Sequence, residues 1–445
     1  MMSSLDGGVS GEGEPIVVEG RGSLPSYFDV TGLATASIGA AGLLLAKLSS
    51  RDSDVPPRVC VDQRLASHWF GMALRPSGWE LPSVWDDLAG VFQANDGWIR
   101  LHTNAPAHRA AALVAVGCDA NRAAVEAAVS GWSAEALESA VVAAGGCAAV
   151  MRSIEQWHEH PQGRAVAQTP LVLWKHVPIE AKAVDSHDPS HPLAGVRVLD
   201  LTRVLAGPVG SRFLAAYGAE VLRIDPPQWD EPGVVPEVTL GKRCAGLDLK
   251  NSSDRKIFEG LLRGADVFLH GYWADALAGL GYDDEVLRNL NPDLIDVSLN
   301  AYGWAGEWRN RRGFDSLVQM SSGIADLGMK ESGTPGPKPL PVQALDHATG
   351  YLLAASVLSG LLRRGKGEAC SAKLSLARVA HLLIKTRRSE IGSEFAPAAD
   401  EEIDPRPEET AWGPARRVRW PLEVEETRAA WPYPATRLRS ARPEW

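Results

Sequence analysis

The stretch that decides the fold is residues 193–227, LAGVRVLDLTRVLAGPVGSRFLAAYGAEVLRIDPP. An apolar run at 196–201 predicts a buried strand, and residues 208–217 predict a helix with proline in its first turn. A second strand follows at 220–224. Strand, helix and strand in this order predict two parallel strands joined by a helical crossover.

The same alternation continues after residue 227. The further predicted segments are strands at 244–249, 266–270, 294–299 and 372–376, a helix at 252–263 capped by Asn251 or Ser252, and a long apolar helix at 346–364. We therefore predict an α/β fold with a doubly wound, Rossmann-like parallel sheet.

The part of the chain before residue 193 has a different pattern. An apolar helix is predicted at 31–48 and a strand at 58–62, and Asn95-Asp96-Gly97 is a hairpin signal before an alternating strand at 98–102. The first helix and strand are expected to belong to the large domain, and the segment with the hairpin signal predicts a smaller α+β domain. The expected divisions are 1–24 (flexible leader), 25–85 (helix–strand segment of the large domain), 86–180 (small α+β domain), 181–192 (linker), 193–390 (Rossmann-like domain) and 391–445 (extended C-terminal segment).

Composition narrows the class of protein. Of 445 residues, 45% are apolar and 22% charged, which predicts a packed core, and the net charge of -10 argues against a nucleic-acid partner. Five scattered cysteines without a C-x-x-C pair predict reduced thiols in a cytoplasmic protein. The start of the sequence lacks a signal-peptide pattern, and the helix at 31–48 is expected to be buried rather than to span a membrane.

Two segments of the sequence resemble each other. The helix and strand of residues 30–66 align without gaps through the helix with residues 344–380, and Gly32 then stands opposite Asp346. Apolar helix–strand units also look alike by chance, so the likeness alone does not establish a repeat.

Asp346 is the candidate for chemistry. We expect it to open the helix at 346–364 as an N-cap, held ionised by the helix dipole and by backbone hydrogen bonds. A carboxylate in a dry cavity can attack an activated acyl group and form a covalent intermediate. The alternative is that Asp346 is a structural cap, which the residue type alone favours.

Other polar groups give weaker signals. The Gly-Pro-Val-Gly turn at 207–210 could hold an anion, and Asp225 stands where a ribose-binding acid would, but the dinucleotide glycine fingerprint is absent. Lys242, Arg243 and the arginines of 309–312 could bind phosphates or lie solvated at the surface. His158 and His160 lack a third ligand at metal-binding spacing, so no metal is expected.

Taken together, these motifs resemble class III CoA-transferases, the family of formyl-CoA:oxalate and carnitine CoA-transferases, whose superfamily includes α-methylacyl-CoA racemase. After residues 193–227 the resemblance continues through GKRCAGLDLKN, ADVFLHGY and ALDHATGYLLAASVLSGLLRRGKGE, and covers about residues 193–385. Residues 86–180 resemble the family's small domain in NDGWIRLHTN and GGCAAVMRSIEQWHEHPQG. In the family that domain usually follows the catalytic helix, whereas here it precedes it.

The resemblance implies a function and a set of site residues. Asp346 would be the nucleophile that attacks an acyl-CoA thioester, and coenzyme A would be a substrate rather than a tightly bound cofactor. The positions matched to the CoA thiol end, its phosphates or the site entrance are Arg203, Val204, Leu205, Ala206, Lys242, Arg243, Tyr272 and Arg312. The implied partners are an acyl-CoA and a small carboxylic acid, and family dimers make a homodimer a further expectation.

Two departures from the family pattern keep alternatives open. Gly271–Asp275 reads GYWAD where the family has N-F-R-P-G, so a non-catalytic CoA-binding protein is one alternative. The racemase branch has a histidine where this chain has Phe314, and phenylalanine cannot move a proton. An acyl-CoA racemase or isomerase is therefore the second choice after CoA transfer.

Overall fold

The structure is a computed structural model that describes residues 1–5, 16–50, 57–184, 186, 188–391 and 395–445. Its main feature is a seven-stranded sheet in the order β10-β9-β8-β11-β12-β13-β7. The strands are β8 (Arg197–Leu201), β9 (Glu220–Asp225), β10 (Lys242–Gly246), β11 (Val267–His270), β12 (Ile295–Asn300), β13 (Glu368–Ser375) and β7 (Leu173–Pro178). All pair in parallel except β7, which is antiparallel to β13. The predicted doubly wound α/β fold is confirmed.

The strand order reverses between β8 and β11, because the chain runs outward from β8 to β10 and then from β11 to β13. Loops at the carboxyl ends of such strands diverge at the reversal and leave a crevice there. The loops that follow β8 and β11 are therefore the expected walls of a ligand site.

Helices cover both faces of the sheet. On one face α16 (Ala344–Arg364) packs against α2 (Val30–Ser49), against α9 (Ala206–Ala216) and on strands β12 and β13. On the other, α11 (Ser252–Arg263) and α13 (Asp284–Leu290) bury Phe258, Leu262 and Leu287 against Leu199 and Phe268. Residue burial on both faces explains why the central strands read as continuous apolar runs.

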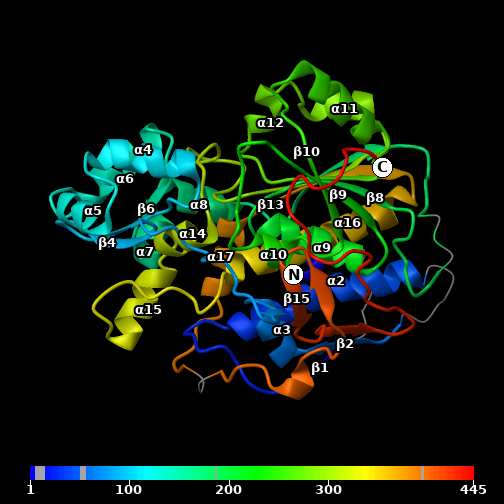
Figure 1. Cartoon of the computed structure of the whole chain (residues 1–445), viewed down its shortest axis with the longest axis horizontal. Coiled ribbons are helices and arrows are strands. Elements are labelled where there is room, and N and C mark those ends of the chain that lie inside the picture. Colours follow the sequence, from blue (N-terminus) through cyan, green and yellow to red (C-terminus); the bar gives the residue numbers. More distant parts are fainter. Residues whose placement is uncertain (6–15, 51–56, 185, 187, 392–394) are drawn as a thin grey trace.

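A smaller unit lies at one side of the molecule, at the left of Figure 1. Its sheet is β4 (Gly90–Gln93), β5 (Trp98–Leu101) and β6 (Ala148–Val150), covered by α4 (Pro106–Val116), α5 (Arg122–Val129) and α6 (Ala134–Ala143). These elements share a separate apolar cluster that includes Ile99, Leu137 and Val141. The predicted limits of the small domain, 86–180, also contain β7, which lies at the edge of the large sheet.

The C-terminal segment joins strands from the start of the chain. One small sheet has the order β1 (Val17–Glu19), β2 (Val59–Asp62), β16 (Leu422–Val424), and another the order β14 (Glu408–Thr410), β15 (Gly413–Arg417), β3 (Leu74–Pro76). The segment is more regular than the extended chain we expected.

The remaining elements connect these layers. They are α1 (Met2–Leu5), α3 (Gln63–Trp69), α7 (Ile154–Glu159), α8 (Pro161–Gln168), α10 (Val235–Val238), α12 (Ala276–Gly279), α14 (Asp315–Ser321), α15 (Ile324–Ser332), α17 (Leu376–Ile384) and the 3-10 turn Asp400–Glu402. Among the described residues, α2 is the one helix long and apolar enough to cross a bilayer, and 78% of its apolar window is buried inside the fold.

Candidate active site

A cavity of about 430 Å³ opens at the carboxyl ends of the central strands. Val204 and Leu205 after β8, residues 229–234 after β9, and residues 314–316 after β12 form one side. The opposite side comes from the first quarter of the chain, with residues 70–72, 83–86, His102, Asn104 and Ala105. Both the large sheet and the N-terminal part of the chain therefore build this site.

Asp346 lines this cavity from the first turn of α16 and is only 8% exposed. It is the third residue of the helix, not the N-cap: the cap position is Gln343, whose side chain makes no capping bond. The backbone N–H of Asp346 donates instead to Asp315 Oδ2 at 2.9 Å. The expectation that Asp346 caps its own helix was wrong, because a carboxylate from α14 already occupies that role.

Asp346 and Asp315 form a buried pair of carboxyl groups. Burial raises the pKa of Asp346 well above its ordinary value, and the negative charge of Asp315 raises it further. Burial also raises the pKa of Asp315 to about 6, although Gln319 and the backbone of α16 donate hydrogen bonds that favour its charged form. Our expectation that Asp346 is held ionised is corrected: burial and the neighbouring Asp315 both favour the protonated form of its carboxyl group.

Two neutral imidazoles line the same cavity. The ring of His102 stacks on Phe314 with centroids 3.7 Å apart, and His347 stacks on Phe70 at 5.3 Å. Burial lowers the pKa of His102 well below its usual value, with Arg100 adding to the effect, and lowers the pKa of His347 to about 3. The Nδ1 atoms of both rings are buried without a hydrogen-bond partner among the described residues.

The loop after β8 carries backbone strain at the cavity. Val204 has φ of 63°, a left-handed conformation that a β-branched residue rarely adopts, and such positions cost about 1–3 kcal/mol. Its N–H donates to Glu231 Oε2 at 2.9 Å. A hydrogen bond from the loop after β9 therefore helps to hold the strained residue against the cavity.

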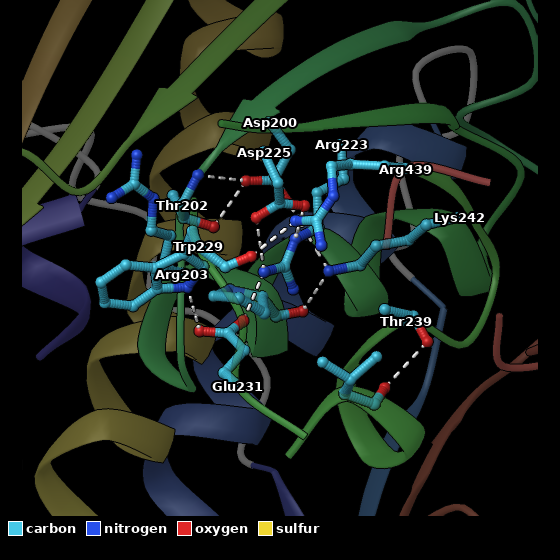
Figure 2. Close-up of polar contacts among 12 residues, drawn as sticks. Asp200, Thr202, Arg203, Arg223, Asp225, Trp229, Glu231, Thr239, Lys242 and Arg439 are labelled. Atoms are coloured by element: carbon cyan, nitrogen blue, oxygen red, sulfur yellow. Dashed lines mark hydrogen bonds and ion pairs between the residues drawn. The ribbon is translucent and has the colours of Figure 1, made fainter. Parts of the chain in front are cut away.

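Buried ion pairs fix that second loop in turn (Figure 2). Arg223 is fully buried and contacts both Asp225, at 2.9 Å, and Glu231, while Trp229 Nε1 donates to Glu231 at 2.8 Å. Arg439 donates to the backbone oxygen of Trp229. Removing one partner of a buried pair typically costs about 3–5 kcal/mol, so this network gives both loops a defined position.

Arg203 lies at the same edge of the cavity. Its guanidinium carbon is 4.8 Å from the ring of Trp229 and 5.5 Å from the ring of Tyr272, and Nη2 lies 3.4 Å from the Tyr272 hydroxyl. The structure therefore brings Arg203, Val204, Leu205 and Tyr272 into one neighbourhood, while Ala206 begins α9 and is buried.

The basic residues assigned to CoA phosphates are not gathered there. Lys242 is buried in the core, where Nζ donates to Pro208 O at 2.9 Å and pairs with Asp200 at 3.4 Å, and burial lowers its pKa to about 8. Arg243 pairs with Glu220 at 2.7 Å on the neighbouring strand. Lys242 therefore has a structural role, which corrects its assignment as a phosphate contact.

Arg312 is exposed, and its guanidinium carbon lies 4.3 Å from the ring of Trp273. It also donates to the backbone oxygen of Gly145 in the small domain. Its side chain is thus accessible to a ligand at the surface, outside the residues that line the cavity.

The weaker signals in the sequence mark structural positions. Asp225 is fully buried and paired with Arg223, so it cannot reach a ribose. His158 and His160 do not assemble with other ligands: the described residues contain no cluster of three or more His, Cys, Asp or Glu able to hold a metal.

Sequence reasoning missed most of the cavity wall. Trp229 and Glu231 follow directly after a parallel strand, a position that could have identified them. His102 ends the alternating strand of the small domain but carries no local signal of its role. Phe70 and Trp85 come from N-terminal segments whose packing against the large sheet no local pattern encodes.

The fold and the site define a class: a doubly wound α/β protein whose buried carboxyl group faces a cavity at the point where the strand order reverses. Comparison with known proteins makes this specific. Residues 193–405 match the model of CoA-transferase family III. This part of the chain therefore belongs to that family.

The curated relatives include CoA-transferases. An acyl-CoA transferase of Gibberella moniliformis is 29% identical over 307 residues, 64% of this chain and 54% of the relative. A succinyl-CoA:glutarate CoA-transferase of Mus musculus is 34% identical over 213 residues, 44% of this chain and 48% of the relative. The chain thus spans about half the length of these relatives.

A solved structure of Rv3272 from Mycobacterium tuberculosis, in an orthorhombic crystal form, is 32% identical to this chain. The match covers 44% of this chain and 56% of that one, with a TM-score of 0.40.

Proposed function

We propose that this protein transfers coenzyme A from an acyl-CoA donor to a carboxylic acid through a covalent intermediate on Asp346. The observation that carries the proposal is the position of Asp346: a buried carboxyl group in the first turn of α16, facing a cavity, within a family III domain. The names of the relatives support the same reaction class.

The reaction would run in two exchanges. The Asp346 carboxylate attacks the thioester carbonyl, the C–S bond breaks, and CoA leaves as a thiolate from a mixed anhydride. The thiolate then attacks the aspartyl carbonyl, giving an aspartyl-CoA thioester and the free donor acid. The acceptor carboxylate attacks this thioester to form a new anhydride, and the thiolate returns to the acceptor acyl carbon, which restores Asp346.

Burial of Asp346 makes the loss of its proton less favourable, but it also makes the ionised carboxylate more reactive. The raised pKa of Asp346 favours its protonated form, and a protonated carboxyl group must lose its proton before attack; Asp315 is the adjacent group able to share that proton. Once ionised, a desolvated carboxylate is a better nucleophile than one in water, and binding of the CoA handle supplies the positioning.

Trapping tests the covalent step directly. Hydroxylamine added during turnover should convert an acyl-Asp346 into a hydroxamate, visible by mass spectrometry of the peptide that contains residue 346. Asp346→Asn is the matched control and should give no adduct. CoA binding without any adduct in the parent protein would instead support a non-catalytic CoA-binding role.

Racemisation or isomerisation of an acyl-CoA is the second candidate, favoured by one observation. His102 lies against Phe314, the position where the racemase branch has its histidine, and its imidazole lines the same cavity as Asp346. A neutral histidine and a carboxyl group form an acid–base pair. Deuterium incorporation at the α-carbon of an acyl-CoA in deuterated water, abolished in His102→Gln, would support this reaction over CoA transfer.

A further inference from the structure

The cavity beside Asp346 has aromatic walls. Phe314 stacks with His102, and Trp85 meets His102 edge-on with centroids 5.8 Å apart. Trp229 and Phe70 line other parts of the same cavity. Flat rings favour a ligand group that can stack or pack against them and that leaves no polar atom unsatisfied.

Apart from two histidines, the ionisable side chains that line this cavity in the described part of the chain are all acidic. Asp86, Asp230, Glu231, Glu237, Asp315 and Asp346 line it, whereas lysine and arginine do not. The two histidines do not add positive charge, since burial lowers the pKa of each.

The nearby arginines do not line the cavity: some pair with its acidic residues, and Arg203 and Arg100 lie over aromatic rings. Arg212 and Arg417 pair with Glu237, and Arg223 pairs with Glu231. Arg100 lies over the ring of Trp85, 4.6 Å from its centroid, and is not part of the lining. A second carboxylate on a ligand would therefore enter a low-dielectric space where no lining residue is a cation and where it would lie beside existing carboxyl groups.

We propose that the acyl group accepted in this cavity is uncharged and apolar, with an aromatic ring preferred, and that dicarboxylic acyl groups are excluded. This inference rests on the proposed function, because it takes the cavity beside Asp346 as the acyl site. It separates this chain from its relative named for succinyl-CoA and glutarate, whose substrates each carry a second carboxylate.

Binding of two thioethers tests the preference without requiring any reaction. S-(2-phenylethyl)-CoA and S-(3-carboxypropyl)-CoA lack a thioester carbonyl, so Asp346 cannot attack them. By calorimetry on the full chain we expect the phenylethyl compound to bind about 10²-fold more tightly, the range in which a buried unpaired polar group is rejected. Equal affinity, or a preference for the carboxypropyl compound, would overturn the inference.

A charge placed in the wall provides a second test. Val84 lines the cavity and is 39% exposed, so an arginine can fit there with its stem along the wall. Val84→Arg should improve binding of the carboxypropyl compound by at least about 10-fold, because it supplies the missing counter-ion. Val84→Met, of similar length but uncharged, should give no such gain, and a gain in both variants would contradict the electrostatic argument.

The two proposals fail in different ways. If free CoA and both thioethers fail to bind, the proposed function falls and the substrate preference falls with it. If the thioethers bind with the reverse order, only the substrate class is wrong. If the expected order is seen but no carboxylic acid accepts CoA in a transfer assay, the cavity is described correctly and the reaction is not.

Discussion

The two long buried helices, α2 and α16, show how similar scaffolds differ by one functional group. Each packs against the other, and each is followed by a strand, β2 or β13. The aligned positions, Gly32 and Asp346, are both the third residue of their helices. In both, the backbone N–H of that residue donates to an aspartate: Gly32 to Asp29 at 2.8 Å, and Asp346 to Asp315 at 2.9 Å.

The origin of the capping aspartate is the difference. In α2 the cap comes from the adjacent turn, and a Cβ on Gly32 would lie 2.2 Å from an oxygen of Asp29. In α16 the cap comes from α14, 31 residues earlier in the chain, so the third position is free to carry a side chain into the cavity. A remote cap thus makes room for a reactive group where a local cap allows only glycine.

Removing the one carboxyl group that distinguishes the two helices should have the largest effect on CoA transfer. Asp346→Ala should lower CoA transfer by at least about 10³-fold, as expected for loss of a nucleophile, with circular dichroism and melting behaviour retained. Asp29→Ala in the other helix removes an aspartate at a comparable place and should keep most of the activity. Full activity of Asp346→Ala would remove the proposed mechanism.

Transplanting the carboxyl group tests the other helix. Gly32→Asp should destabilise the fold by about 2 kcal/mol, because the new side chain displaces Asp29 from its cap and crowds a buried turn. Urea unfolding measures the change. Gly260→Asp in α11 is the control, since a Cβ there meets no atom within 4 Å, and it should be close to neutral. Equal losses in both variants would show that helix propensity, not crowding, sets the cost.

The buried carboxyl pair should make stability depend on pH. Both pKa values are raised in the fold, that of Asp315 from 3.8 to about 6, so the native state holds protons that the unfolded chain releases. The free energy of unfolding should therefore fall as pH rises from about 4 through 6 and beyond. Unfolding measured at several pH values should show a flatter profile for Asp346→Asn and for Asp315→Asn, and an unchanged slope in both would contradict the pairing.

The smallest effect is expected for the local cap of α2. Asp29→Ala should cost about 1 kcal/mol, because it removes the hydrogen bond to Gly32 and a partly exposed ion pair with Arg388 of small value. Asp29→Asn keeps an acceptor for the N–H of Gly32 and should recover most of the loss. A loss near 4 kcal/mol in the free energy of unfolding would mean that Asp29 has a role beyond capping.

The comparison also marks what could be predicted from the sequence. The six parallel strands of the large sheet and the helices α2, α9, α11 and α16 follow from apolar periodicity, which is a local property, whereas the antiparallel edge strand β7 was not predicted. Asp346 lies in the first turn of its helix, close to the start at which the sequence placed it, and its side chain lines the cavity. The identity of the cap did not follow, since Asp315 reaches α16 only through tertiary packing.

Two further differences between prediction and structure have physical causes, namely burial of a charged residue and the shortness of four strands. Lys242 looks like a phosphate ligand in the sequence, yet it pairs with Asp200 in the core, and one lysine in a strand carries no sign of which face it takes. The short strands β1, β3, β14 and β16 were missed because each is three residues long and is defined by its partner rather than by its own pattern.

The joining of early and late strands has a consequence during synthesis on the ribosome. Strand β2 is made early, but its antiparallel neighbour β16 emerges far later, and Arg58 N donates to Glu425 across 367 residues. Until then one edge of β2 stays open to pairing with other nascent chains. Slow translation would prolong that exposure. The yield of folded protein in cells should therefore depend on how quickly the last quarter of the chain is synthesised.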